Sequence, residues 1–166
     1  MSTNKYKPHV LVLPEDDANR QIANGFELFE SINRRSLQVL PPAGGWAKVV
    51  GKFGKELAST LRKFPKRHVV MVIDFDKDPE RFQEVRNGIP ADLLDRVFII
   101  GSWDEPEDLR SDLGDFESIG GRVAEECYDT ASDGDSIWNH ELLRHNADEL
   151  ARMKQQLAPF LFEQER

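Results

Sequence analysis

Short apolar runs alternate with segments of helical spacing along the first hundred residues of the chain. Each apolar run is rich in branched residues, which is typical of strands buried on both faces of a parallel sheet. These runs predict strands at residues 9–13, 37–40, 68–73 and 97–100. Apolar residues at helical spacing predict helices that run to about Asn33, from Trp46 to Leu61, and from Pro79 through Val85.

The order of these elements predicts the fold class. Strand and helix alternate through residue 100, which favours an α/β architecture with a mainly parallel, Rossmann-like sheet flanked by helices. With right-handed crossovers, the common strand order is 2-1-3-4. We expect a single domain over residues 1–166, with a core at about 9–110 and a helical C-terminal extension at about 111–166. That extension is predicted to contain a helix at 119–128, a turn at Asp133-Gly134-Asp135 and a final helix at 141–162.

The amino-acid composition limits the classes of protein to which this chain can belong. The 166 residues include 30 acidic and 22 basic side chains, so the net charge of −8 argues against binding nucleic acid by bulk charge. It leaves room for a site in which metal ions lie between carboxylates and phosphate. The chain lacks an apolar run of the roughly 18–20 residues that cross a membrane, and residues 1–8 lack a secretory signal, so we expect a cytoplasmic protein. The single cysteine, Cys127, excludes a disulfide framework and a cysteine-cluster zinc site.

Acidic side chains cluster where the first and third predicted strands end. The two clusters are Glu15, Asp16 and Asp17, and Asp74, Asp76 and Asp78. In the order 2-1-3-4 these strands are neighbours, so both clusters meet at the edge where α/β sheets bind ligands. Asp74 and Asp76 can flank a common point, because alternate residues of an extended chain point the same way. Carboxylates this close do not all stay ionised without a cation.

The chemistry predicted for this edge is binding of Mg²⁺ or Mn²⁺, because these hard cations prefer carboxylate oxygens. Such a metal can orient a phosphate group and activate water. The plainer interpretation is that each acidic residue caps the helix that follows its strand, a common role for aspartate.

Substrate-binding residues are predicted beside these acids. Gly44 and Gly45 precede a helix, so their N–H groups could hold a phosphate, although a flexible turn explains them as well. Lys48 and Lys52 begin the most basic stretch of the chain, residues 48–67. This strip could hold a nucleic-acid backbone or could be a solvated helix face.

Two segments carry a resemblance to the Toprim domain, the catalytic module of topoisomerases, bacterial primases and several nucleases. They are Leu11-Val12-Leu13-Pro14-Glu15 and Val72-Ile73-Asp74-Phe75-Asp76, and the resemblance covers about residues 9–110. It implies that Glu15 is a general acid or base and that Asp74 and Asp76 bind metal.

The chain departs from the Toprim pattern at Asp16, where glycine is usual. Asp16 is either an additional metal ligand or a sign that the site has drifted. Asp17 or Asn19 corresponds loosely to a polar position that the family often has. In nuclease members, which include those resembling the overcoming-lysogenization-defect type, a further acidic residue follows the fourth strand. Glu105 or Glu107 would fill that place here.

The function implied by this resemblance is metal-dependent phosphodiester chemistry on DNA or RNA, most simply as a nuclease. A chain of this length has little surface for substrate selection, so a protein partner is an additional expectation. Two other classes remain open. One is a phosphoacceptor domain resembling response-regulator receivers, with Asp74 as the acceptor, and the other is a non-catalytic interaction subunit with a degenerate site.

Overall fold

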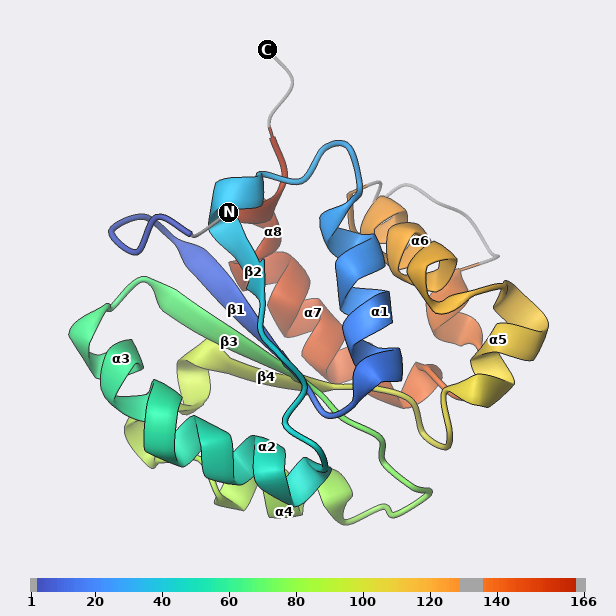
Figure 1. The fold of residues 1–166 in the computed structure, drawn as a ribbon, viewed down its shortest axis with the longest axis horizontal. Coiled ribbons are helices and arrows are strands. Elements are labelled where there is room, and N and C mark those ends of the chain that lie inside the picture. Colours follow the sequence, from blue (N-terminus) through green and yellow to red (C-terminus); the bar gives the residue numbers. More distant parts are fainter. Residues whose placement is uncertain (1–2, 129–135, 164–166) are drawn as a thin grey trace.

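The computed structural model describes residues 3–128 and 136–163, which are arranged around an all-parallel sheet of four strands in the order β2-β1-β3-β4 (Figure 1). The strands are β1 (His9–Pro14), β2 (Leu37–Val39), β3 (Arg67–Val72) and β4 (Val97–Ile100). In register, Val10 lies opposite Leu37 on one side and His68 on the other. The predicted α/β class, the parallel sheet and the strand order are therefore confirmed.

One face of the sheet is covered by the helices that follow β2 and β3 (Figure 1). These are α2 (Trp46–Lys52), α3 (Ala58–Lys63) and α4 (Arg81–Asn87), with a π-helical segment, Phe53–Leu57, joining α2 to α3. Leu13 and Met71 of the sheet pack on this side with Phe53 and Leu61, and all four are fully buried. The helix predicted from Trp46 to Leu61 is thus present, with a π-helical stretch in its middle.

The opposite face is covered by the first helix and by the C-terminal part of the chain (Figure 1). The helices of this side are α1 (Asp17–Glu27), α5 (Glu107–Leu113), α6 (Phe116–Tyr128), α7 (Ala147–Gln156) and α8 (Ala158–Leu161). Helices α1 and α6 pack so closely that a Cβ atom at Gly120 would lie 1.8 Å from the Ile22 carbonyl oxygen. Glycine at position 120 is therefore a requirement of this helix crossing.

Side chains of the C-terminal region satisfy the outer edge of β4. The Ile99 N–H donates to Glu149 Oε2 at 2.9 Å. Asn146 accepts from the Gly101 N–H at 3.1 Å and donates to the Gly101 carbonyl at 2.9 Å. Asn146 and Glu149 are 2% and 5% exposed. The extension thus pairs the backbone groups that an edge strand would otherwise leave open.

Several predicted boundaries differ from the structure; for example, the helix predicted from Pro79 begins at Arg81. The first helix ends at Glu27 rather than near Asn33, because residues 31–33 instead bond with the end of the chain, including the Asn33 N–H with the Leu161 carbonyl at 2.7 Å. The predicted helix at 141–162 is divided into a 3₁₀ turn (Arg144–Asn146), α7 and α8. The helix predicted at 119–128 begins earlier, at Phe116. The turn predicted at 133–135 lies outside the described residues.

Helix lengths also bear on membrane association. Among the residues that the structure describes, none of the helices combines the length and the hydrophobicity needed to cross a bilayer.

Candidate functional site at the carboxyl edge of the sheet

Glu15 and Asp74 meet at the carboxyl edge of the sheet. The Glu15 N–H donates to the Val72 carbonyl at 2.8 Å, which extends the pairing of β1 with β3 by one step. The Asp74 N–H then donates to Glu15 Oε2 at 2.6 Å. Both side chains are half-buried. The two predicted acidic clusters therefore do share one edge, and these two residues are where they touch.

The start of α1 brings two further polar side chains to Asp74. Asp16 caps α1, with its Oδ1 accepting from the Asn19 N–H at 3.0 Å. Asn19 is 1% exposed, and its Nδ2 donates to Asp74 Oδ1 at 3.2 Å. Capping thus accounts for one oxygen of Asp16, while the side chain also faces Asp74 as a hydrogen-bond partner. Asn19 is a buried hydrogen-bond partner of Asp74 that the sequence indicated only loosely.

The electrostatics of this group favour a protonated Asp74 when no cation is bound. Burial, followed by the charges of Asp16 and Glu15, raises the pKa of Asp74 to about 8, against the opposing hydrogen bond from Asn19. Burial also raises the pKa of Glu15, with the charges of Asp16 and Asp76 adding to it. The Asp74 N–H and Arg81 partly offset that rise. Negative charge is therefore concentrated here beyond what the protein alone neutralises.

Asp76 forms an ion pair with Arg81. Arg81 Nη1 donates to Asp76 Oδ2 at 2.9 Å and to the Asp74 carbonyl at 3.1 Å. The guanidinium stacks on the Trp46 ring at 4.4 Å, and Arg81 is only 9% exposed. The extended backbone from which Asp74 and Asp76 were expected to flank a common point does not continue to Asp76, where the backbone is left-handed (φ 51°).

Asp78 belongs to a second acidic group at the start of α4. Within the described part of the chain, the carboxylate oxygens of Asp78, Glu80 and Glu84 lie within 4.8 Å of one another. Glu80 and Glu84 are exposed, and Arg81 Nη2 lies 3.9 Å from Asp78 Oδ2. Sequence analysis missed Glu80 and Glu84, although their spacing of four on a predicted helix was a usable signal.

The remaining acidic candidates lie away from the Glu15–Asp74 pair. Asp17 is exposed and accepts from Arg20 Nε at 2.8 Å, which with Gln21 lowers its pKa. Glu105 and Glu107 are exposed at the beginning of α5. In that loop it is Asp104 that faces the loop after β3, through an ion pair with Lys77 Nζ at 3.2 Å.

The predicted substrate-binding glycines do lie beside Glu15. The Gly44 N–H donates to the Glu15 carbonyl at 2.8 Å. The exposed Lys48 side chain lies over Gly44, with Nζ 3.7 Å from the place that a Cβ would occupy. Lys52 follows one turn later and is half-buried.

The C-terminal half of the basic stretch lies elsewhere. Arg67 begins β3, so it lies about 20 Å along the strand from the site, at a rise of about 3.3 Å per residue. Arg62 pairs with Asp92, with Nε donating to Oδ2 at 3.0 Å. Of the basic strip, therefore, only the end that contains Lys48 borders the site.

A polar groove of about 770 Å³ opens on the other flank of the loop after β3. Its charged lining consists of Asp104, Asp108, Asp112 and Glu141 against Lys77 and Arg144, with His140 and His145 beside them. His140 is held between Asp112, at 2.8 Å, and the Leu142 N–H, at 3.1 Å. The excess of acidic groups makes this flank unfavourable for a phosphate backbone.

The chain was compared with protein-family models, with curated proteins and with solved structures, and none of the three comparisons gives a match.

Proposed function

We propose that Glu15 and Asp74, with Asp16, bind Mg²⁺ or Mn²⁺ and that the protein is a Toprim-like, metal-dependent nuclease. The observation that carries this proposal is the direct contact between Glu15 and Asp74 at the ligand-binding edge of a parallel sheet, with the Asp74 N–H 2.6 Å from Glu15 Oε2.

The donor set fits a hard divalent cation. Glu15, Asp16 and Asp74 supply carboxylate oxygens, which Mg²⁺ and Mn²⁺ prefer. The Asp74 N–H orients Glu15 Oε2, so we assign Oε1 to the cation. Asn19 Nδ2 orients Asp74 in the same way, through Oδ1. Ligands held by second partners are the usual arrangement at metal sites.

The residues around the pair have distinct roles in this proposal. A bound divalent cation supplies Lewis-acid polarisation of a phosphoryl oxygen. Glu15 accepts or donates the proton through Oε1 when that oxygen is not on the cation, and burial raises its pKa above the ordinary value of a glutamate. Lys48 and the Gly45 N–H hold the phosphate backbone beside Glu15, while the Gly44 N–H positions this loop through its bond to the Glu15 carbonyl.

A second candidate function is favoured by the ion pair between Arg81 and Asp76. Its 2.9 Å contact neutralises a carboxylate that the Toprim pattern assigns to metal. In a non-catalytic subunit, which would have the same fold and a degenerate site, this ion pair would stay formed permanently.

Cleavage assays separate the two functions. Plasmid DNA and a single-stranded RNA would be incubated with Mg²⁺ or Mn²⁺ and with wild type, Glu15→Gln, Asp74→Asn and Glu84→Gln. The nuclease proposal expects cleavage that needs the metal, that is lost in the first two variants and that survives in Glu84→Gln, which alters the outer acidic group alone. Absence of cleavage by the wild type on both substrates, with the metal bound, would instead support the non-catalytic subunit.

A further inference from the structure

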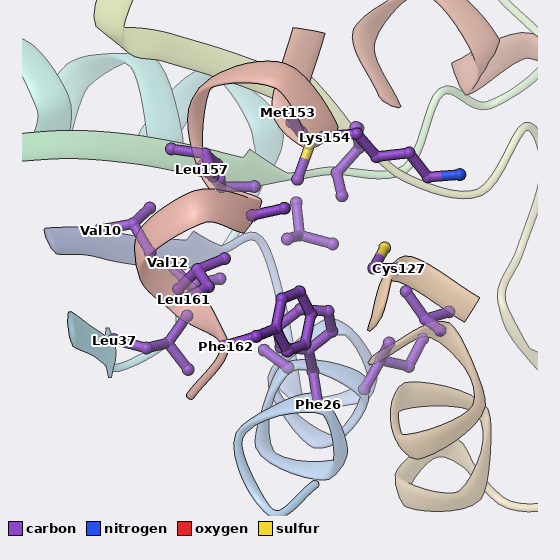
Figure 2. A pocket seen from close by; sticks show the side chains of 17 residues that line it. Val10, Val12, Phe26, Leu37, Cys127, Met153, Lys154, Leu157, Leu161 and Phe162 are labelled. Carbon is purple, nitrogen blue, oxygen red and sulfur yellow. The ribbon is translucent and has the colours of Figure 1, made fainter. Parts of the chain in front are cut away.

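A cavity of about 90 Å³ lies between the α1 side of the sheet and the helices that cover it (Figure 2). Its floor is formed by β1, β3 and neighbouring strand residues, and its walls by α1, α6, α7 and α8. The lining residues are Val10, Val12, Ile22, Ala23, Phe26, Leu37, Val70, Val72, Ile100, Val123, Cys127, Met153, Lys154, Leu157, Ala158, Leu161 and Phe162. Apart from the thiol of Cys127 and the amine of Lys154, every side chain in this set is a hydrocarbon or a thioether.

The size and lining of the cavity favour an apolar occupant. A single water needs about 10–15 Å³ of such space and two to four polar partners, so this lining does not hold water well. The volume of about 90 Å³ corresponds to roughly six to nine water-sized positions. A methylene group is close to a water molecule in size, so a chain of about eight carbons matches the space.

The two ends of the cavity differ in polarity. Figure 2 shows Val10 and Leu37 at one end and Cys127 and Lys154 at the other, with the Lys154 amine directed outward. The methylene groups of Lys154 thus line the wall while its charge lies at the mouth. The nearby carboxylate of Glu126 is engaged by the Ile137 N–H at 2.9 Å.

We propose that this cavity binds a medium-chain carboxylate, with the methyl end toward Val10 and Leu37 and the carboxylate paired with Lys154. The site is separate from the metal site, because none of Glu15, Asp16 and Asp74 lines the cavity. The proposal therefore does not depend on the nuclease function.

Cys127 serves this site as a wall residue and as a reporter. Burial raises the pKa of its thiol to about 11, with the positive charge of Lys154 opposing that rise, so the thiol stays protonated and is a poor nucleophile. It is the single cysteine of the chain, so any thiol modification reports on this cavity alone.

Binding and thiol protection test the proposal in the full chain. Calorimetric titration with octanoate should show saturable binding, whereas acetate, which lacks the chain, should give none. Saturating octanoate should slow the modification of Cys127 by a thiol-reactive disulfide at least tenfold. Absence of saturable binding, or binding without protection of Cys127, would overturn the proposal.

Matched lysine variants test the polar end. Lys154→Met keeps the length of the side chain. We expect it to weaken the binding of octanoate about tenfold and to leave the binding of 1-octanol unchanged. Lys55→Met removes an exposed charge from the π-helical segment on the other side of the sheet and should change neither ligand. Equal loss of octanoate in both variants, or unchanged octanoate binding by Lys154→Met, would contradict the assignment of the carboxylate to Lys154.

Discussion

The backbone N–H of Asp74 donates a 2.6 Å hydrogen bond to Glu15 Oε2, across 59 positions of sequence. This bond fixes the relative position of two carboxyl groups that end neighbouring strands. It also brings two like charges close together in a half-buried place, which is an unfavourable arrangement unless a proton or a cation intervenes. The arrangement of Glu15 and Asp74 therefore favours the binding of either a proton or a cation.

Replacing Asp74 with asparagine should stabilise the cation-free protein in a pH-dependent way. The folded-state pKa of about 8 lies above the ordinary value for aspartate, so the folded state binds more protons than the unfolded state between about pH 4 and pH 8. The stability that this proton provides is complete below about pH 4 and is lost as the pH rises through 8. The difference in stability between Asp74→Asn and wild type should thus be largest near pH 8.5.

Urea unfolding in the presence of a chelator, from pH 4 to pH 8.5, measures this difference. A gap between Asp74→Asn and wild type that stays constant across that range would show that the pKa of Asp74 is not raised. Asp17→Asn serves as the matched control: hydrogen bonds from Gln21 and Arg20 lower the pKa of Asp17, so its difference from wild type changes only below about pH 4 and should stay flat across this range.

Removing the charge of Arg81 should destabilise the fold. Arg81→Met keeps contact with the Trp46 ring but leaves Asp76 and the Asp74 carbonyl without their donor. We expect a loss of about 1–3 kcal/mol in the free energy of unfolding, typical of leaving a partly buried polar group unpaired. Chemical denaturation measures this loss. The control is Arg20→Met, which breaks an exposed ion pair with Asp17 and should change the free energy of unfolding little. Equal effects of the two substitutions would mean that the Arg81 pair adds nothing beyond a surface contact.

Asn146 should matter strongly to stability, because it is a buried polar residue whose side chain bonds the backbone. Its side chain makes three hydrogen bonds, with the Gly101 N–H, the Gly101 carbonyl and the Leu143 carbonyl. Asn146→Ala leaves these buried backbone groups unpaired, and we expect a loss of about 2–4 kcal/mol. Gln155→Ala, at an exposed position of α7, should stay within about 0.5 kcal/mol of wild type. If the loss of stability in Asn146→Ala is equally small, the C-terminal extension does not stabilise the edge of β4 through this residue.

Two helical glycines should respond in opposite directions to the same substitution. A Cβ at Gly120 would lie 1.8 Å from the Ile22 carbonyl oxygen, so Gly120→Ala must push α1 and α6 apart and should cost about 1–3 kcal/mol. Gly51, in α2, has no atom within 4 Å of its Cβ position, and Gly51→Ala should stabilise the helix by about 0.5–1 kcal/mol. Thermal unfolding of both variants measures the signs, and a shared sign would contradict the close crossing of α1 and α6.

The sequence predicted the sheet and the meeting of Glu15 with Asp74 for the same reason. Four apolar runs were long enough to mark strands, and right-handed connections left one simple order for them. Once the strands were placed, their last residues had to share an edge. The glycine loop at Gly44 followed from the same geometry, because it continues from β2, which lies next to β1.

Other features of the site depend on contacts that no local pattern encodes. Arg81 reaches Asp76 only because the backbone turns left-handed at Asp76 and Lys77, which the spacing of aspartates does not reveal. The end of the chain was predicted as one helix because its apolar spacing continues, yet Asn146 bonds Gly101 and the helix restarts there. In both places a tertiary hydrogen bond overrides local preference.

Titration of the cation-free protein with Mn²⁺ tests the central claim most directly, with wild type, Asp74→Asn and Glu84→Gln compared by calorimetry at pH 7. We predict that wild type and Glu84→Gln bind the cation with similar affinity and that Asp74→Asn does not bind it. Binding that persists in Asp74→Asn and disappears in Glu84→Gln would place the ion in the Asp78–Glu80–Glu84 group and would contradict the assignment of Glu15 and Asp74 as its ligands.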